Sequence, residues 1–108
     1  MKHRVTLRDV AVKDFRALDG ETQRQARRQF EKLGRNPELG ANLGNKLGID
    51  LTGYRALHFG RNRYRIVYRS LREEAEVEVW GIAKREVGAV YRMVARRIDE
   101  ARDEATGS

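Results

Sequence analysis

The chain has 108 residues, the size of a single domain, which leaves no room for a second core. It contains no cysteine, and this excludes thiolate catalysis, cysteine-ligated metal sites and a disulfide framework, while fitting a reducing compartment. Lys and Arg number 23 against 16 Asp and Glu, so the formal net charge is +7 in a globular composition with a basic bias. Two histidines, His3 and His58, are too few for a histidine-rich metal site.

Nothing in the sequence indicates a membrane segment. No stretch approaches the roughly 18 apolar residues of a membrane span, and the first residues lead into a polar alternation with no apolar signal region. We therefore expect a cytoplasmic protein that does not bind membranes.

The N-terminal third of the chain predicts a strand followed by a helical hairpin. Residues 4–8 alternate between polar and apolar side chains with period two, as a half-buried strand does. Apolar side chains then recur at helical spacing over residues 12–18, and Asp19 with Gly20 interrupts them. A second helix with a basic outer face follows and ends near Gly34.

The remaining two thirds predict a long connection, three strands and a helix. Residues 34–53 hold five of the ten glycines and the only proline, which is typical of a loop with at most a short helical turn. Strands are expected over residues 54–59, 63–71 and 75–83, as an antiparallel meander, followed by a helix to about residue 100. We expect one domain over 1–100 and a polar, disordered tail over 101–108.

This order of elements predicts an α+β fold, with an N-terminal strand and helical hairpin packed on a small, mostly antiparallel sheet and a C-terminal helix. In the middle strand the alternation places Tyr64, Ile66 and Tyr68 on one face and Arg63, Arg65, Val67 and Arg69 on the other. Burying three arginines against helices without partners would be prohibitive. We therefore expect the helices on one face and an open arginine face.

The basic charge is concentrated in this part of the chain. Residues 51–72 carry six arginines and no acidic residue, with four aromatic side chains interleaved among them. A block of this kind is typical of binding to a phosphate-bearing partner. A solvated sheet face would carry the same charges, so charge alone leaves both interpretations open.

Four motifs stand in a fixed order in the second half of the chain. They are Tyr54-Arg55, then Arg63-Tyr64-Arg65-Ile66-Val67-Tyr68, then Val79-Trp80-Gly81-Ile82-Ala83-Lys84-Arg85-Glu86, and finally Val90-Tyr91. In order and spacing they resemble the RelE/ParE superfamily of bacterial toxins, and the similarity runs from the first strand to about Ile98. The fold of that superfamily, a small sheet packed on an N-terminal helical hairpin, agrees with the periodicity.

The resemblance implies the toxin of a type II toxin–antitoxin pair, held in a hetero-oligomer by a cognate antitoxin. Because the chain has a net charge of +7 and an arginine face, we expect that antitoxin to be acidic or amphipathic. On the RelE side, the superfamily cleaves mRNA on the ribosome by attack of a ribose 2′-hydroxyl on the adjacent phosphate, without metal or cofactor. On the ParE side, it poisons DNA gyrase and does no chemistry of its own. An inactive member that only binds is a third interpretation. The motif set favours the RelE side.

The superfamily's ribonuclease residues correspond here to Arg55, Arg65, Arg85 and Tyr91. The planar, permanently charged forks of Arg65 and Arg85 suit a phosphate whose charge grows in the transition state. Tyr91 would stack on a base, although its place on an apolar helix stripe is also typical of a core tyrosine. The RNA backbone is expected to lie against Arg55, Arg61, Arg63, Arg69 and Lys84, of which Lys84 could simply mark a strand end.

One position departs from the superfamily pattern and concerns the general base. Where the active ribonucleases keep a second strand lysine, this chain has Leu57, followed by His58. His58 shares strand parity with Tyr54, which predicts a half-buried structural histidine. The hairpin arm is also about one residue longer than the pattern, and a bulge near Leu57 would turn His58 to the arginine face. There an imidazole with a pKa of about 6.5 suits a general base.

Overall fold

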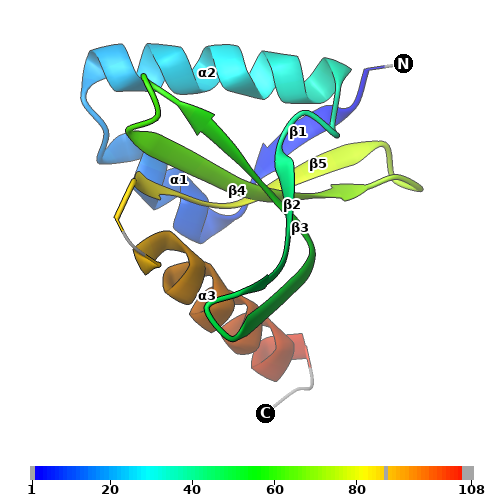
Figure 1. The fold of residues 1–108 in the computed structure, drawn as a ribbon. Coiled ribbons are helices and arrows are strands. Elements are labelled where there is room, and N and C mark those ends of the chain that lie inside the picture. The colour runs from blue at the N-terminus through cyan, green and yellow to red at the C-terminus, as the bar shows by residue number, and fades with distance from the viewer. Residues whose placement is uncertain (1, 87, 106–108) are drawn as a thin grey trace.

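The computed structural model describes residues 2–86 and 88–105. The elements in chain order are β1 (Arg4–Leu7), α1 (Asp9–Arg16), α2 (Gly20–Arg35), β2 (Ala41–Lys46), β3 (Ile49–Phe59), β4 (Tyr64–Leu71), β5 (Glu76–Lys84) and α3 (Ala89–Ala105). They form the expected α+β domain, in which a five-stranded sheet lies between α1 and α2 on one side and α3 on the other (Figure 1).

The helical hairpin is confirmed, and short-range chemistry explains where its second helix begins. The carboxylate of Asp19 accepts a hydrogen bond from the backbone N–H of Thr22 at 2.8 Å, which caps α2. The same bond holds the pKa of Asp19 below its ordinary value. Ala26 and Leu33 on the inner face of α2 are fully buried, and Phe30 meets the ring of Phe15 from α1.

The sheet has the strand order β1-β5-β4-β3-β2. β2, β3, β4 and β5 form an antiparallel meander, and β1 lies parallel to β5 at one edge. The alternation expected in β4 is confirmed. Ile66 and Tyr68 pack against the helical hairpin, together with Phe59 and Val79.

The expectation that the opposite face would be open is wrong, because α3 covers much of it. Val67, which alternates with the arginines of β4, is fully buried in a second cluster with Val90 and Val94 of α3. The arginines next to it lie at the margins of α3, where both remain partly exposed. Arg65 extends over the ring of Tyr91, and Arg69 pairs with a glutamate.

A partly buried ion pair fixes α3 to the rest of the molecule. The carboxylate of Asp14 in α1 accepts two hydrogen bonds from the guanidinium of Arg97 in α3, at 2.7 and 3.0 Å. It also accepts the backbone N–H of Ile82 at 3.0 Å, while Arg97 donates to the carbonyl of Trp80. Three elements, α1, β5 and α3, therefore meet at one carboxylate.

The long connection predicted over residues 34–53 is wrong in its second half, where β2 and the start of β3 form a hairpin. The glycines that indicated a loop instead bend the strands, since Gly44 and Gly53 both have positive φ. Leu43 and Leu51 from this hairpin are buried against the α3 side. Figure 1 shows the hairpin curving out of the sheet toward α3.

The C-terminal helix is longer than its sequence pattern predicts. It continues to Ala105, five residues into the segment expected to be a tail, and residues 106–108 lie outside the described residues. Among the described residues, no helix is long and apolar enough to cross a membrane.

Candidate nucleic-acid interface

A pocket of about 410 Å³ opens where β4, the end of β5, the start of α3 and the tip of the β2–β3 hairpin meet. Its polar and aromatic lining comes from Lys46, Arg65, Arg85, Glu86 and Tyr91. Three of these are cations and one is a carboxylate. The pocket is therefore positively charged and has an aromatic ring in its wall, which is a suitable combination for a nucleotide.

Arg65 is the central cation of this pocket. Its guanidinium lies over the ring of Tyr91, with 5.3 Å between the guanidinium carbon and the ring centroid. Its Nε is buried and has no hydrogen-bond partner among the residues that the structure describes. Arg65 also lines the pocket, so an anion bound there would meet its positive charge.

Tyr91 belongs to both the core and the pocket. Its side chain is 8% exposed and packs in the cluster beneath α3, as its position on the apolar stripe predicts. The part that remains accessible lines the pocket next to Arg65. The core interpretation and the binding interpretation of Tyr91 are therefore compatible.

His58 faces the same side of the sheet as Arg65, but for a different reason from the one expected. The pairing of β3 with β4 has no bulge, and His58 is the direct cross-strand partner of Arg65. Tyr54 and Ala56, which share its parity, face α3 rather than the helical hairpin. Regular alternation therefore carries His58 to the arginine face, and the expected bulge near Leu57 is wrong.

The environment of His58 favours the neutral imidazole. Its side chain is exposed at the sheet surface, yet partial burial lowers its pKa below 6.5, and the charges of Arg65 and Arg85 lower it further. A neutral imidazole next to two guanidinium groups can accept a proton near neutral pH.

Arg85 reaches the pocket because β5 ends next to the β3–β4 turn. Its backbone N–H donates to the carbonyl of Arg63 at 2.6 Å, which fixes the chain just beyond the strand. A second hollow of about 400 Å³ is also lined by Arg85, together with Arg61, Arg63 and Lys84. The expected RNA-binding residues Arg61, Arg63 and Lys84 are thus brought together near the pocket.

The β3–β4 turn presents its arginines through an uncommon backbone. Gly60, Arg61 and Asn62 have φ values of 62°, 58° and 66°, so three consecutive residues lie in the left-handed region. Arg61 and Arg63 are consequently exposed at the tip. A run of non-glycine residues in this region is strained, and such strain is common at binding loops.

Two of the arginines expected to bind RNA lie elsewhere. Arg55 is on the helical-hairpin face, where its guanidinium donates to the carbonyls of Gly40 and Glu38 at 2.7 and 3.2 Å. Arg69 shares a face with Arg65 but is four residues further along β4, about 13 Å away. There it donates to Glu78 at 2.7 Å.

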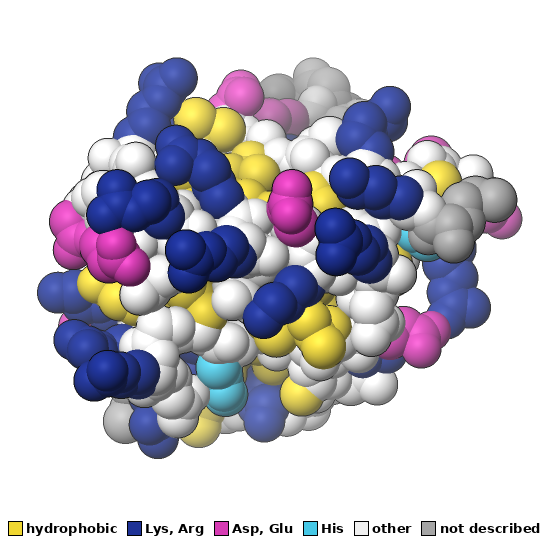
Figure 2. Space-filling model, turned by 90° about the horizontal axis from the view of Figure 1, so that it is seen from above, with side chains coloured by type: hydrophobic (Ala, Val, Ile, Leu, Met, Phe, Trp, Pro, Cys, Tyr) yellow, Lys and Arg dark blue, Asp and Glu magenta, His cyan; other side chains and the backbone are white. Residues whose placement is uncertain are grey.

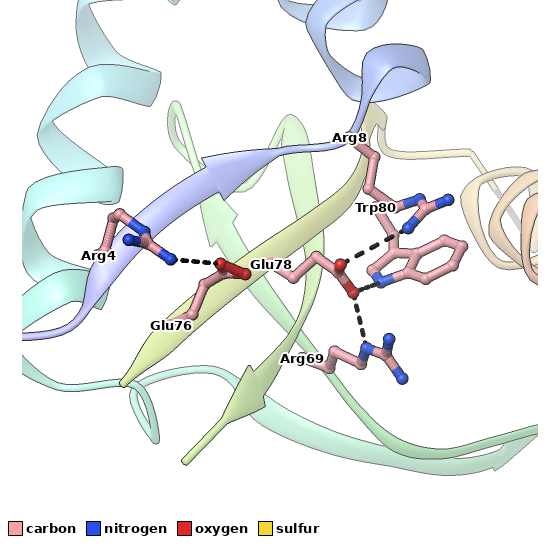
Figure 3. A network of polar contacts seen from close by, with 6 residues as sticks. All are labelled: Arg4, Arg8, Arg69, Glu76, Glu78 and Trp80. Atoms are coloured by element: carbon pink, nitrogen blue, oxygen red, sulfur yellow. Dashed lines mark hydrogen bonds and ion pairs between the residues drawn. The ribbon is translucent and has the colours of Figure 1, made fainter. Parts of the chain in front are cut away.

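The surroundings of Arg69 form a structural network (Figure 3). Glu78 accepts hydrogen bonds from Arg69 and from the indole N–H of Trp80, at 2.7 and 2.8 Å, and pairs with Arg8 at 3.6 Å. The guanidinium of Arg8 lies 4.1 Å from the centroid of Trp80. Arg69 therefore stabilises the fold through its pair with Glu78, at the other end of β4 from the pocket.

Sequence reasoning missed Lys46 and Leu47, which line the pocket from the hairpin tip. The glycines around them indicated a loop, and no local pattern places that loop beside Arg65. Figure 2, which looks down on the side that α2 covers, shows Lys and Arg side chains spread over that surface as well. Positive charge alone therefore does not single out the pocket.

Solved structures with the same fold are toxins. A mutant of the Escherichia coli toxin RelE in the free state has 22% identity and a TM-score of 0.73, covering 91% of this chain and 99% of that chain. The toxin–antitoxin complex RelBE2 from Mycobacterium tuberculosis has 24% identity and a TM-score of 0.66, with 79% and 100% covered. The archaeal RelE–RelB complex from Pyrococcus horikoshii OT3 has 17% identity and a TM-score of 0.59, with 79% and 97% covered.

At these identities the structures establish the fold alone. No curated protein sequence matches the chain. A family model described as the ParE toxin of the type II toxin–antitoxin system parDE matches residues 5–87, which is most of the domain. The chain therefore belongs to the ParE toxin family, within the RelE/ParE superfamily of type II toxin–antitoxin toxins.

Proposed function

We propose that this toxin is a ribosome-dependent endoribonuclease that cleaves mRNA by attack of a ribose 2′-hydroxyl on the adjacent phosphate. The observation that carries the proposal is the direct pairing of His58 with Arg65 across β3 and β4, beside the pocket lined by Arg85 and Tyr91. These groups supply a base, positive charge and an aromatic surface within one small area.

Each group suits one requirement of the reaction. The neutral imidazole of His58 removes the proton from the 2′-hydroxyl, whose oxygen then forms a bond to phosphorus. Arg65 and Arg85 stabilise the negative charge that grows on the phosphate oxygens in the transition state. The 5′-oxygen of the following nucleotide leaves with its electron pair and takes a proton from water or from the imidazolium of His58. The step needs no metal ion.

Tyr91 and the second hollow would position the strand. The accessible part of Tyr91 offers an aromatic surface to a base that lies over the pocket. Arg61, Arg63 and Lys84 lie where the neighbouring phosphates of the strand would pass. Holding the 2′-hydroxyl in line with the leaving oxygen would itself contribute to the rate.

A second candidate function comes from the family match, whose description names ParE toxins. A ParE-like toxin would inhibit DNA gyrase without cleaving RNA. In that case the pocket would bind a protein surface or nothing, and the pairing of His58 with Arg65 would have no chemical role.

One induction experiment separates the two candidates. Cells would express the wild-type protein or Arg65→Ala, with mRNA ends mapped by primer extension and gyrase-linked DNA breaks assayed in parallel. The proposal expects cuts within translated messages that follow the reading frame and vanish in Arg65→Ala. Gyrase-linked breaks without mRNA cuts would instead establish the ParE-like function.

A further inference from the structure

We propose that the tip of the β2–β3 hairpin is part of the RNA-binding site and that Lys46 binds a backbone phosphate of the RNA, next to the scissile one. This inference rests on the proposed endoribonuclease function and adds a binding residue to its site. The argument uses the position of Lys46, the contact that holds the tip, and the charge balance of the pocket.

Strand pairing places Lys46 on the pocket side of the sheet. Its cross-strand partner is Ile49, and directly paired residues of antiparallel strands share a face. Ile49 packs against the cluster beneath α3, so the side chain of Lys46 is on that side too. Lys46 lines the same pocket as Arg65 and Arg85.

A specific contact holds the tip at the beginning of α3. The Cδ1 atom of Leu47 lies so close to Gly88 that a Cβ atom at that position would collide with it. Gly88 also has a φ of 73°, which favours glycine. Leu47 is otherwise 61% exposed, so its approach to Gly88 is a small contact that places the tip next to the residue before α3.

Two glycines direct the hairpin toward Gly88 and the beginning of α3. Gly44 and Gly53 have φ values of 55° and 92°, and a Cβ atom at either would have open space around it. Glycine is therefore required there by backbone conformation and not by crowding. The pairing of β2 with β3 shifts register between Asn42 and Gly44, which produces the bend toward α3 seen in Figure 1.

The charge balance of the pocket indicates the ligand. Lys46 is exposed and makes no ion pair or hydrogen bond with any described residue, so it contributes nothing evident to the fold. It adds a third cation to a pocket whose lining contains one carboxylate, Glu86. Cations gathered in one place repel each other unless an anion joins them, and each nucleotide of RNA brings one negative charge.

The test measures kinetics on ribosome-bound mRNA and binding to a single-stranded RNA whose 2′-O-methyl riboses prevent cleavage. Lys46→Ala should raise KM about two- to fivefold, as loss of one exposed phosphate contact does, with kcat within about twofold of wild type. The slope of log Kd against log salt should fall by about 0.7, the change for one phosphate contact on a single strand. Lys46→Arg should restore both values.

Two further variants complete the design. Lys13→Ala removes an equal charge from α1, on the other side of the sheet, and should leave KM and the salt slope unchanged. Leu47→Asn keeps the charge of Lys46 but removes the leucine contact with Gly88 that positions the tip, and it should reproduce the rise in KM. Melting temperatures within about 2 °C of wild type would show that each variant is folded.

The outcomes separate this inference from the proposed function. A wild-type protein that neither cleaves nor binds RNA would overturn both. Cleavage by the wild type with the same KM and salt slope in Lys46→Ala and Lys13→Ala would overturn the inference alone. A fall in kcat without a change in KM would also overturn it, because Lys46 would then act in the chemical step and not in binding.

Discussion

Arg65 combines two properties that a purely structural residue rarely has. Its guanidinium lies over a core tyrosine, and its buried Nε has no acceptor among the described residues. The ring contact and the burial of Nε restrict the side chain before a ligand arrives. An anion that fills the pocket would therefore meet a cation already in position, which is the condition under which electrostatic stabilisation of a transition state is largest.

We expect Arg65→Ala and Arg85→Ala each to slow cleavage of ribosome-bound mRNA by about 10² to 10³, because each removes one preorganised charge. Circular dichroism and melting temperature should stay close to wild type, since neither side chain fills the core. The matched control is Arg72→Ala, which removes an exposed arginine that pairs with Glu38 far from the pocket. Growth arrest by a soluble Arg65→Ala or Arg85→Ala protein would contradict the assignment of these arginines.

Tyr91 requires a test that separates packing from binding. Tyr91→Ala should lower the free energy of unfolding by about 3 kcal/mol or more, because the ring is 8% exposed and packs beneath α3. It should also abolish cleavage. Tyr91→Phe keeps the ring and should retain stability and most of the activity, measured by urea unfolding and by primer extension. Loss of activity in a stable Tyr91→Phe protein would assign a role to the hydroxyl instead.

The pH dependence of cleavage should report on His58. The base is the neutral imidazole, and burial with Arg65 and Arg85 holds the pKa of His58 below 6.5. The rate should therefore fall as the pH is lowered and the imidazole takes up a proton, and the midpoint of this decline should lie below pH 6.5. His58→Gln should reduce cleavage at least about tenfold and remove the acidic decline, with ribosome binding unchanged. Unchanged cleavage in this variant would assign the base to another group.

At the scale of elements, the position of α3 determines the geometry of the pocket. Tyr91 is in the first turn of that helix, while the bidentate pair of Arg97 with Asp14 fixes the helix nearly two turns further on. The two side chains of this pair are 16% and 15% exposed, so their contact is shielded from solvent. The orientation of Tyr91 over the sheet therefore depends on a carboxylate in α1.

Asp14→Ala should destabilise the protein by about 2 to 4 kcal/mol, since it leaves Arg97 partly buried without its charge partner and frees the N–H of Ile82. Urea unfolding followed by tryptophan fluorescence would measure this. The control is Glu21→Ala, which breaks the exposed ion pair with Arg24 and should leave the unfolding midpoint unchanged. Equal losses in the free energy of unfolding from the two substitutions would show that the Asp14–Arg97 pair contributes no more than an exposed ion pair.

Periodicity predicted the helices, four of the five strands and the alternation of β4, because each depends on side chains close together in sequence. It did not predict which face α3 covers. Tyr54 and Ala56 alternate as core residues do. This sheet has a core on each side, however, so parity alone does not show which of the two cores these residues join. Arg55 was consequently placed on the wrong side, and His58 reaches the arginine face by regular alternation and not by the expected bulge. The hairpin of β2 with β3 was missed because its bend requires glycines that also signal loops.

At the scale of the whole molecule, the positive charge extends well beyond the pocket. The helix α2 carries five Lys and Arg against two Glu, and basic side chains spread across its surface in Figure 2. A molecule with a net charge of +7 and basic surfaces on both sides of its sheet is attractive to polyanions from several directions. Nucleic acid and an acidic protein would compete for such a surface.

The solved relatives include complexes of toxins with antitoxins, and we expect a cognate antitoxin here whose acidic side chains meet these basic surfaces. Its affinity for the toxin should fall as salt rises from 0.05 to 0.5 M, because the Debye length shrinks from about 14 to about 4 Å over that range. Calorimetric titration of the two purified proteins would measure the change.

A double variant in which Glu replaces both Arg28 and Lys32 would show whether the antitoxin covers α2. The salt dependence should decrease if α2 is covered, and stay unchanged if the antitoxin binds only near the pocket. An affinity independent of salt would contradict the charge argument, because apolar burial would then account for the binding.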